Sequence, residues 1–302
     1  MRIRMIMKAI VPLVLVSLAL PKSPIYAHGE KGSMKKGILL VAFGSTIPEA
    51  QVSFENIDRS VRKAFPGVEV YWAYTSRTII AKMAKEGKHL VTPVEALARM
   101  MREKFTHVAV QSLHVIPGAE FHGLVQNVRR FEGMSKGMEQ VLVGYPLLAT
   151  SEDLRRVAEA MLKVIPSERK ANDAVVFMGH GTHHPADVYY AALNYHVQKM
   201  DPNIFVGTVE GWPEIDDMIG ELKKEGLKKA YLMPFMSVAG DHARNDMAGP
   251  EEDSWKSILE KEGITCEPVL KGMAEYPEFV EMWVEFVEMW VDHLKTVFSH
   301  FP

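Results

Sequence analysis

The sequence predicts an α/β protein made of two similar domains, each with a parallel sheet flanked by helices. Short apolar runs alternate with longer amphipathic segments along most of the chain, a pattern typical of parallel sheets. The second half then repeats the first, so that "ILLVAFGST" (residues 38–46) aligns with "AVVFMGHGT" (residues 174–182). This repetition indicates an internal duplication, and we expect the two domains to face a central cleft.

Residues 1–27 are predicted to form a secretory signal peptide. Arg2 and Arg4 give a basic start, and the apolar run over residues 9–20 is too short for a comfortable membrane span. Ala27 offers a small residue before a cleavage site. We therefore expect cleavage after Ala27, export to the periplasm and no stable membrane anchor in the mature chain. The alternative is an uncleaved anchor.

The first domain is expected over residues 34–147. Pro66 and Gly67 end its first helix, while Thr92 and Pro93 supply an N-cap and a first-turn proline for the next one. In order, the predicted elements are a strand over 37–43, a helix over 47–65, a strand over 68–74, a helix over 94–104, and strands over 107–113 and 140–143.

The second domain is expected over residues 148–273 and should carry the metal site. Its "AYLMPFMSVAGDH" (230–242) aligns with "VAVQSLHVIPGAE" (108–120) of the first domain. The overlay places Phe43 opposite His180 and Glu120 opposite His242. The predicted elements are strands over 174–178, 204–209, 229–235 and 265–270, and helices over 185–199, 213–225 and 254–262.

The last part of the chain, residues 274–302, is predicted to be a long helix. The heptapeptide "EFVEMWV" occurs twice in succession, over 278–284 and 285–291, so its aromatic and Met side chains recur on one helical face. That face should pack on the body of the protein or on a partner subunit. We expect a homo-oligomer.

Composition limits the class of the protein. Hydrophobic residues make up 47% and charged residues 24%, as in soluble globular proteins. A formal net charge of −3 argues against a nucleic-acid binder, which is usually basic. Cys266 is the one cysteine, so an intrachain disulfide cannot form and a buried core must stabilise the fold.

Chemistry-bearing residues follow three strands of the second domain. His180 stands after the first strand, Glu210 after the second and His242 just past the third. Because the carboxyl ends of parallel strands share one edge of a sheet, these side chains can converge. Two imidazoles and one carboxylate suit a first-row divalent metal and leave coordination positions open. Phe43 replaces the histidine in the first domain, so we expect one metal site.

Neighbouring residues leave alternatives open. His183 and His184 either cap the helix that begins at Pro185 or act as a second metal relay. Asp241 could replace Glu210 as the carboxylate ligand. His114 and His122 in "SLHVIPGAEFHGL" are either ordinary loop residues or, for His122, an exposed imidazole that binds haem iron axially.

Three motifs carry a resemblance to a known family: "LLVAFGST", "GHGTHHPAD" and "MPFMSVAGDHARNDMAG". With them the mature chain resembles the class II chelatases, and most of all the sirohydrochlorin cobaltochelatases of the anaerobic cobalamin pathway. The resemblance implies a lyase that inserts Co²⁺, or Fe²⁺, into a tetrapyrrole without a nucleotide. It assigns metal binding and catalysis to His180 and His242, with Glu210 and Glu120 as acidic partners. The signal peptide departs from the cytoplasmic setting of that pathway.

The expected reaction sets further requirements. Metal insertion removes two N–H protons from the macrocycle, and neutral imidazole can serve as both ligand and base. A flat, carboxylate-rich macrocycle needs apolar walls and cationic contacts. The candidates are Phe43, Tyr74, Leu113, Trp212, Met236 and Val238 for the walls, and Arg77 and Arg244 for the carboxylates.

Two other functions fit parts of the pattern. A periplasmic metal- or tetrapyrrole-binding or transport protein would use the same ligands without turnover. A hydrolase would use His180 of the "GHG" motif as a phosphohistidine nucleophile, although such sites usually gather several arginines and none flanks His180.

Overall fold

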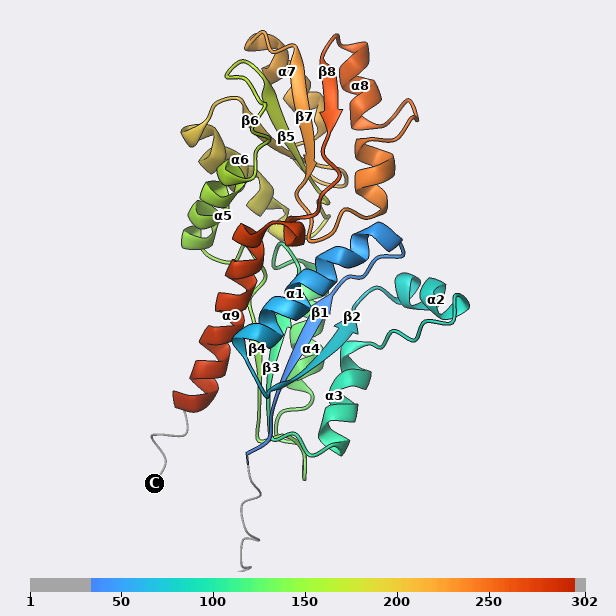
Figure 1. Cartoon of the computed structure of the whole chain (residues 1–302), viewed down its shortest axis with the longest axis vertical. Helices are drawn as coiled ribbons and strands as arrows, with labels where there is room; N and C mark the ends of the chain where they lie inside the picture. The colour runs from blue at the N-terminus through green and yellow to red at the C-terminus, as the bar shows by residue number, and fades with distance from the viewer. Residues whose placement is uncertain (1–33, 297–302) are drawn as a thin grey trace, which may run out of the picture. The chain divides into compact units, whose positions relative to one another are not determined.

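The computed structural model describes residues 34–296, and it contains two four-stranded parallel sheets flanked by helices (Figure 1). The strand order is β2-β1-β3-β4 in the first sheet and β6-β5-β7-β8 in the second. The same order in both sheets confirms the predicted α/β fold and agrees with an internal duplication. The predicted signal peptide, residues 1–27, lies outside the described residues.

The first sheet is built from the residues that the apolar pattern indicated. Strand β1 pairs in parallel with β2 on one side and with β3 on the other. The elements in this half are β1 (Lys36–Ala42), η1 (Pro48–Ala50), α1 (Gln51–Ala64), β2 (Glu69–Tyr74), α2 (Arg77–Lys85), α3 (Pro93–Arg102), β3 (His107–Ser112), α4 (Ala119–Arg129) and β4 (Gln140–Gly144).

The second sheet repeats this arrangement around β5, which pairs with β6 and β7. The elements are α5 (Ser151–Lys163), β5 (Ala174–Gly179), η2 (Pro185–Asp187), α6 (Val188–Met200), β6 (Ile204–Thr208), α7 (Ile215–Lys224), β7 (Lys229–Pro234), η3 (Ala243–Met247), α8 (Trp255–Lys261), β8 (Thr265–Pro268), η4 (Met273–Glu275) and α9 (Pro277–Thr296). Element η3 is a short π-helical segment.

Local sequence explains which helices were predictable. Thr92 caps α3 and Pro93 stands in its first turn, as the sequence indicated, and the structure adds Glu95, which completes a capping box. Helices α2, α4 and α5 were not predicted. Helix α4 begins after Gly118 without a side-chain cap, so its start carries no local signal. Helix α5 does have a capping box, formed by Thr150 and Asp153, which the sequence reasoning missed.

The largest apolar cluster contains residues from both halves of the chain. Ile38 of β1, Phe177 of β5 and Trp283 of α9 are all buried in it. Helix α9 packs against α1, β3, β4 and α5, as the repeated heptapeptide led us to expect for contact with the body of the protein. The ring of Phe279 on α9 also contacts Phe235, just after β7, with 6.5 Å between centroids. Helix α9 therefore bridges both sheets through one core.

Further contacts between the two halves are polar. The Ser237 hydroxyl donates to the Leu113 carbonyl oxygen at 2.6 Å, and the Asn56 amide donates to the Ala274 carbonyl oxygen at 3.2 Å. The first bond joins the residues after β7 to the residue after β3, so the carboxyl ends of these strands lie close together. The second joins α1 to η4, just before α9. In the part of the chain described here, no helix is both long and apolar enough to cross a membrane.

Candidate metal centre

The first component of the site is the turn that follows β5. A Cβ on Gly179 would lie 2.4 Å from the ring of buried Tyr190, so only glycine fits there. Gly181 has a φ of +79°, which favours glycine. The two glycines thus explain the "GHG" motif sterically, and they place His180 at the end of the strand. Burial raises the pKa of the Tyr190 hydroxyl above its usual range, so this phenol stays neutral beneath the turn.

The second component is the loop after β6, which carries Glu210. Beyond the regular strands, the Val209 N–H donates to the Gly179 carbonyl oxygen at 3.1 Å, and the Glu210 N–H donates to the His180 carbonyl oxygen at 2.8 Å. The two loops therefore continue the pairing of β5 and β6 for two residues. This pairing places the Glu210 carboxylate beside the His180 ring, with 3.8 Å between Oε2 and Nδ1.

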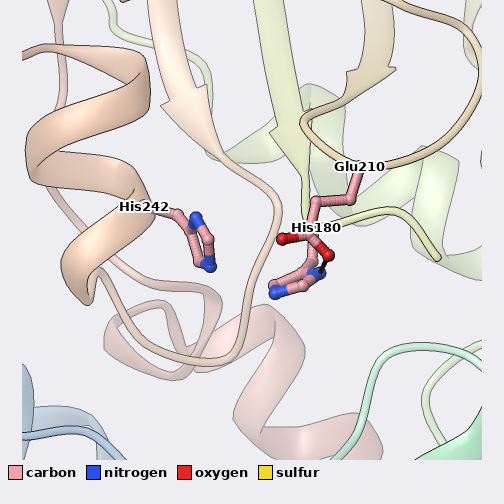
Figure 2. A group of neighbouring side chains, drawn as sticks. All are labelled: His180, Glu210 and His242. Atoms are coloured by element: carbon pink, nitrogen blue, oxygen red, sulfur yellow. Dashed lines mark ion pairs between the residues drawn. The ribbon is translucent and has the colours of Figure 1, made fainter.

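The third component is His242, which stands immediately before η3. Strand β7 lies next to β5, and residues 235–240 connect β7 to the helical turn that carries His242 before η3. The rings of His180 and His242 are nearly perpendicular, with centroids 4.5 Å apart. Figure 2 shows the two imidazoles and the Glu210 carboxylate turned toward one another, with His180 and Glu210 on loops and His242 on the helical turn at the start of η3.

Together, these three residues form a group with metal-binding dimensions. One ligand atom from each of His180, Glu210 and His242 lies within 4.8 Å of the other two. A first-row metal ion bonds N and O ligands at about 2.0–2.2 Å, so its ligand atoms stand at most about 4.4 Å apart, and small side-chain rotations would bring this group onto one ion. The three side chains are 39%, 52% and 33% exposed, respectively. Solvent or a substrate can therefore reach an ion held there.

Hydrogen bonds fix which ring nitrogen of each histidine is free. His180 Nδ1 lies 3.0 Å from the Gly181 carbonyl oxygen, which can only accept, so Nδ1 carries the proton. His242 Nδ1 lies 2.7 Å from Asp246 Oδ2 and donates to that carboxylate. In both rings the Nε2 lone pair is consequently free to bind a metal. A carboxylate behind a ligating histidine also fixes the orientation of its ring. The sequence analysis missed Asp246, although its i,i+4 spacing from His242 was a readable signal.

Other predicted site residues lie outside this group. Glu120 is an exposed residue in the first turn of α4. Asp241 is exposed and accepts a hydrogen bond from the Asn245 side chain at 3.0 Å. Neither belongs to the group whose ligand atoms lie within 4.8 Å. The structure thus brings Glu210, and not Asp241, beside the two histidines.

The histidines of "GTHHP" have different environments. His184 caps η2, because its Nδ1 accepts the Ala186 N–H at 3.1 Å, which was one of the two roles considered. His183 is exposed. The Nε2 of His184 lies 3.2 Å from Nδ1 of His122, which is exposed on α4. Since His184 Nδ1 accepts, its Nε2 carries the proton and donates to His122.

His114 is a structural residue at the end of β3. Its Nδ1 lies 2.8 Å from the Ser112 hydroxyl and its Nε2 lies 3.3 Å from the Thr75 hydroxyl. Burial lowers the pKa of His114 to about 4, so the ring stays neutral at physiological pH. This agrees with the ordinary role considered for it.

The candidate wall residues divide into two groups. The Phe43 ring is 44% exposed and lies 6.5 Å from the His180 ring, between centroids, which is consistent with its expected place in a wall beside the site. Trp212 is 58% exposed on the Glu210 loop. Leu113, in contrast, is only 1% exposed, and its predicted role as a wall is wrong because it packs in the core. Tyr74 packs against Phe54 and Trp72.

The remaining candidates for walls and cationic contacts are Met236, Val238, Arg77 and Arg244. Met236 and Val238 are partly buried against the core. Arg77 is exposed at the start of α2. The Arg244 guanidinium lies 3.9 Å from the Glu49 carboxylate of the first half. Arg244 stands two residues after His242 in the sequence. It is therefore the better candidate of the two predicted cationic contacts.

Comparison with known proteins identifies the family of this chain. The family model described as cobalt chelatase (CbiK) matches residues 36–298. The sirohydrochlorin cobaltochelatase CbiKC of Nitratidesulfovibrio vulgaris is 47% identical over 250 residues, which cover 83% of this chain and 88% of the relative. The sirohydrochlorin cobaltochelatase of Salmonella typhimurium is 36% identical over 253 residues, covering 83% and 94%.

Solved structures show the same fold at low sequence identity. The sirohydrochlorin chelatase SirB from Bacillus subtilis subspecies spizizenii, in complex with cobalt, has a TM-score of 0.58 at 14% identity and covers 87% of this chain and 98% of that one. SirB from Bacillus subtilis with Fe³⁺ has a TM-score of 0.57 at 16% identity and covers 85% and 96%. From the family match and the curated relatives, the chain belongs to the CbiK cobalt chelatase family.

Proposed function

We propose that this chain inserts Co²⁺ into sirohydrochlorin, with His180, Glu210 and His242 holding the ion before transfer. The observation that carries the proposal is the convergence of these three ligand atoms within 4.8 Å. Two curated relatives are named sirohydrochlorin cobaltochelatases, which supports the same metal and macrocycle for this chain.

The proposed donor set suits an ion that must be released. Two neutral imidazoles and one carboxylate neutralise half of the charge of a dication and leave coordination positions for the macrocycle nitrogens. A closed site with four protein ligands would hold the metal as a structural ion. Such a donor set binds Co²⁺ more tightly than Fe²⁺, but copper and nickel more tightly still, so metal supply also decides which ion is inserted. Fe²⁺ is the second candidate.

The proton balance assigns further roles. When the metal enters the ring, two N–H bonds break, metal–nitrogen bonds form and two protons leave. We assign one proton to His242 Nε2 after the ion has left it, because Asp246 stabilises the resulting imidazolium through the 2.7 Å hydrogen bond. Glu120 is the proposed second acceptor, since its carboxylate is exposed on α4. No step in this exchange requires a nucleotide.

The proposed macrocycle contacts come from both halves of the chain. Phe43 and Trp212 expose aromatic surface near His180 and Glu210, suited to the apolar face of a flat ring. Arg244 would exchange its Glu49 partner for a carboxylate of the substrate. These contacts support a substrate that is planar, apolar on its faces and anionic at its rim.

The test is a multiple-turnover assay on the mature chain, residues 28–302. Sirohydrochlorin and CoCl₂ in excess over protein are mixed, and the change in the visible absorption of the macrocycle is followed. The proposal predicts a rate proportional to protein concentration and many products per protein molecule. The alternative, a periplasmic metal- or tetrapyrrole-binding or transport protein, predicts stoichiometric binding and no acceleration.

The phosphohistidine hydrolase is disfavoured by the electrostatics of the site. The Glu210 carboxylate lies 3.8 Å from the His180 ring, where it would repel an incoming phosphate. A metal dication, in contrast, is attracted by the same charge. The site is therefore suited to a cation.

Haem binding at His122 remains a separate proposal. His122 is exposed, which suits an axial ligand on an accessible tetrapyrrole. Its Nδ1 accepts from His184, so ligation through Nε2 would require the hydrogen bond between the two rings to reorganise.

The proposed periplasmic location and a homo-oligomeric state rest on the sequence.

A further inference from the structure

Asp187 occupies an N-cap position but does not cap its own helix. It stands directly before α6, where an aspartate side chain ordinarily accepts a hydrogen bond from an amide of the first turn. No such bond is present here. Instead, Oδ1 accepts the N–H of Thr182 at 2.9 Å and Oδ2 accepts the N–H of Trp212 at 2.7 Å. Both carboxylate oxygens are thus committed to loops outside the helix.

The two amides have matching positions in the two loops that carry metal ligands. Thr182 is two residues after His180 in the loop that follows β5. Trp212 is two residues after Glu210 in the loop that follows β6. One carboxylate therefore joins the loop of a histidine ligand to the loop of the carboxylate ligand. Hydrogen bonds to an ionised acceptor are shorter and stronger than neutral ones.

The space around this carboxylate is closed by glycine. A Cβ added to Gly211 would lie 2.1 Å from Asp187 Oδ1, so a larger residue would expel the carboxylate. A Cβ on Gly181 would lie 2.5 Å from the Gly211 nitrogen, which shows how closely the two loops approach. Gly211 itself does not have a positive φ. Its requirement for glycine is therefore one of space and not of backbone conformation.

We propose that Asp187 is a positioning residue that sets the distance between His180 and Glu210 in the metal site. The inference rests on the proposed function for the role of those two residues as metal ligands. The Glu210 side chain is half-exposed, and its carboxylate approaches His180 Nδ1 only at 3.8 Å. The backbone must therefore fix its position, and Asp187 bridges that backbone to the histidine loop.

Removing the bridge should weaken metal binding more than it weakens the fold. Loss of a group that orients metal ligands typically costs about 10- to 100-fold in metal affinity, and we expect a loss in this range for Asp187→Ala with Co²⁺. Asp187→Asn should give an intermediate loss, because the amide offers one acceptor oxygen and turns an NH₂ group toward the second N–H. This graded response distinguishes positioning from simple packing.

Gly211 provides the decisive comparison. Gly211→Ala should reproduce the loss seen in Asp187→Ala, because the added methyl group occupies the place of the carboxylate. In the double variant, that place is already vacant, so Gly211→Ala should add little to Asp187→Ala. Asp173→Ala is the matched control: this carboxylate also accepts a backbone N–H, from Lys170 at 3.1 Å, but before β5 at the opposite end of the strand.

The experiment measures the Co²⁺ dissociation constant by titration calorimetry and amide hydrogen exchange of the mature chain. Asp187→Ala should weaken Co²⁺ binding and speed exchange at Thr182 and Trp212, while Asp173→Ala does neither. Unchanged Co²⁺ affinity in Asp187→Ala, or full additivity with Gly211→Ala, would overturn the inference. Wild-type protein that binds no Co²⁺ contradicts the proposed function instead. In that case the amide exchange rates, which can be measured without metal, still test the inference. Unchanged exchange at Thr182 and Trp212 in Asp187→Ala would contradict the bridge between the two loops.

Discussion

Replacing Asp246 with Asn tests whether a carboxylate behind His242 prepares that ring as a metal ligand. The His242–Asp246 hydrogen bond is 2.7 Å long, and both side chains are partly exposed, at 33% and 43%. A hydrogen bond to a charged group contributes about 1.5–3 kcal/mol and a neutral one about 0.5–1.5 kcal/mol. Exposure favours the lower ends of these ranges. The expected loss is therefore about 1 kcal/mol, or several-fold in Co²⁺ affinity.

The direction of the effect has a second cause. Asn can turn its NH₂ group toward His242 Nδ1, which would then accept and leave the proton on Nε2, where the metal should bind. Both effects weaken Co²⁺ binding in Asp246→Asn, and none strengthens it.

Titration calorimetry with Co²⁺ at neutral pH measures the change. Asp241→Asn is the matched control, since Asp241 is also acidic, stands next to His242 and makes an i,i+4 hydrogen bond, to Asn245 at 3.0 Å. It removes the same charge without touching the ring. Equal affinities for Asp246→Asn and Asp241→Asn would refute the assigned role of Asp246.

Three further predictions follow from the described residues. His180→Ala and His242→Ala should each abolish Co²⁺ insertion into sirohydrochlorin, whereas Glu210→Ala should mainly weaken Co²⁺ binding; near-normal initial rates in both histidine variants would contradict the site. Burial lowers the pKa of His114 to about 4, so as the pH falls below about 6.5 the unfolded chain binds this proton before the folded chain does. The free energy of unfolding should therefore decline between about pH 6.5 and 4, by on the order of 3 kcal/mol. In denaturant titrations His114→Gln should remove that part of the decline, and an unchanged pH profile would count against the assignment. Added haem should shift the Soret band of the wild type but not of His122→Ala; a shift that survives the substitution excludes His122 as the ligand.

The convergence of the candidate metal-site residues was partly predictable, because parallel strands impose a simple rule. The carboxyl ends of β5, β6 and β7 must lie at one edge of their sheet, so residues shortly after them lie near one another. His180 and Glu210 closely follow β5 and β6, whereas His242 also depends on residues 235–240, which connect β7 to the helical turn before η3. The internal duplication aligned Phe43 with His180, but the proximity of the two rings is seen only in the structure.

The residues that support the ligands were not predictable by this rule. Asp187 lies in the first turn of the helix predicted over 185–199, and only the packed loops show that its carboxylate accepts the N–H groups of Thr182 and Trp212. Asp246 was marked in the sequence only by its i,i+4 spacing from His242, and no apolar period indicates the helical turn of η3 on which that signal depends. Leu113 was assigned to a wall because a strand end does not reveal which face of the sheet is covered. In the structure that face is core.

The most direct test of the metal site is anomalous diffraction at the cobalt edge from crystals of the mature chain soaked in CoCl₂. The site described here predicts one strong peak bonded to Nε2 of His180, Nε2 of His242 and a carboxylate oxygen of Glu210. The peak should be lost in His242→Ala crystals. A strong cobalt peak on other residues, or no peak between these three side chains, would contradict the assignment.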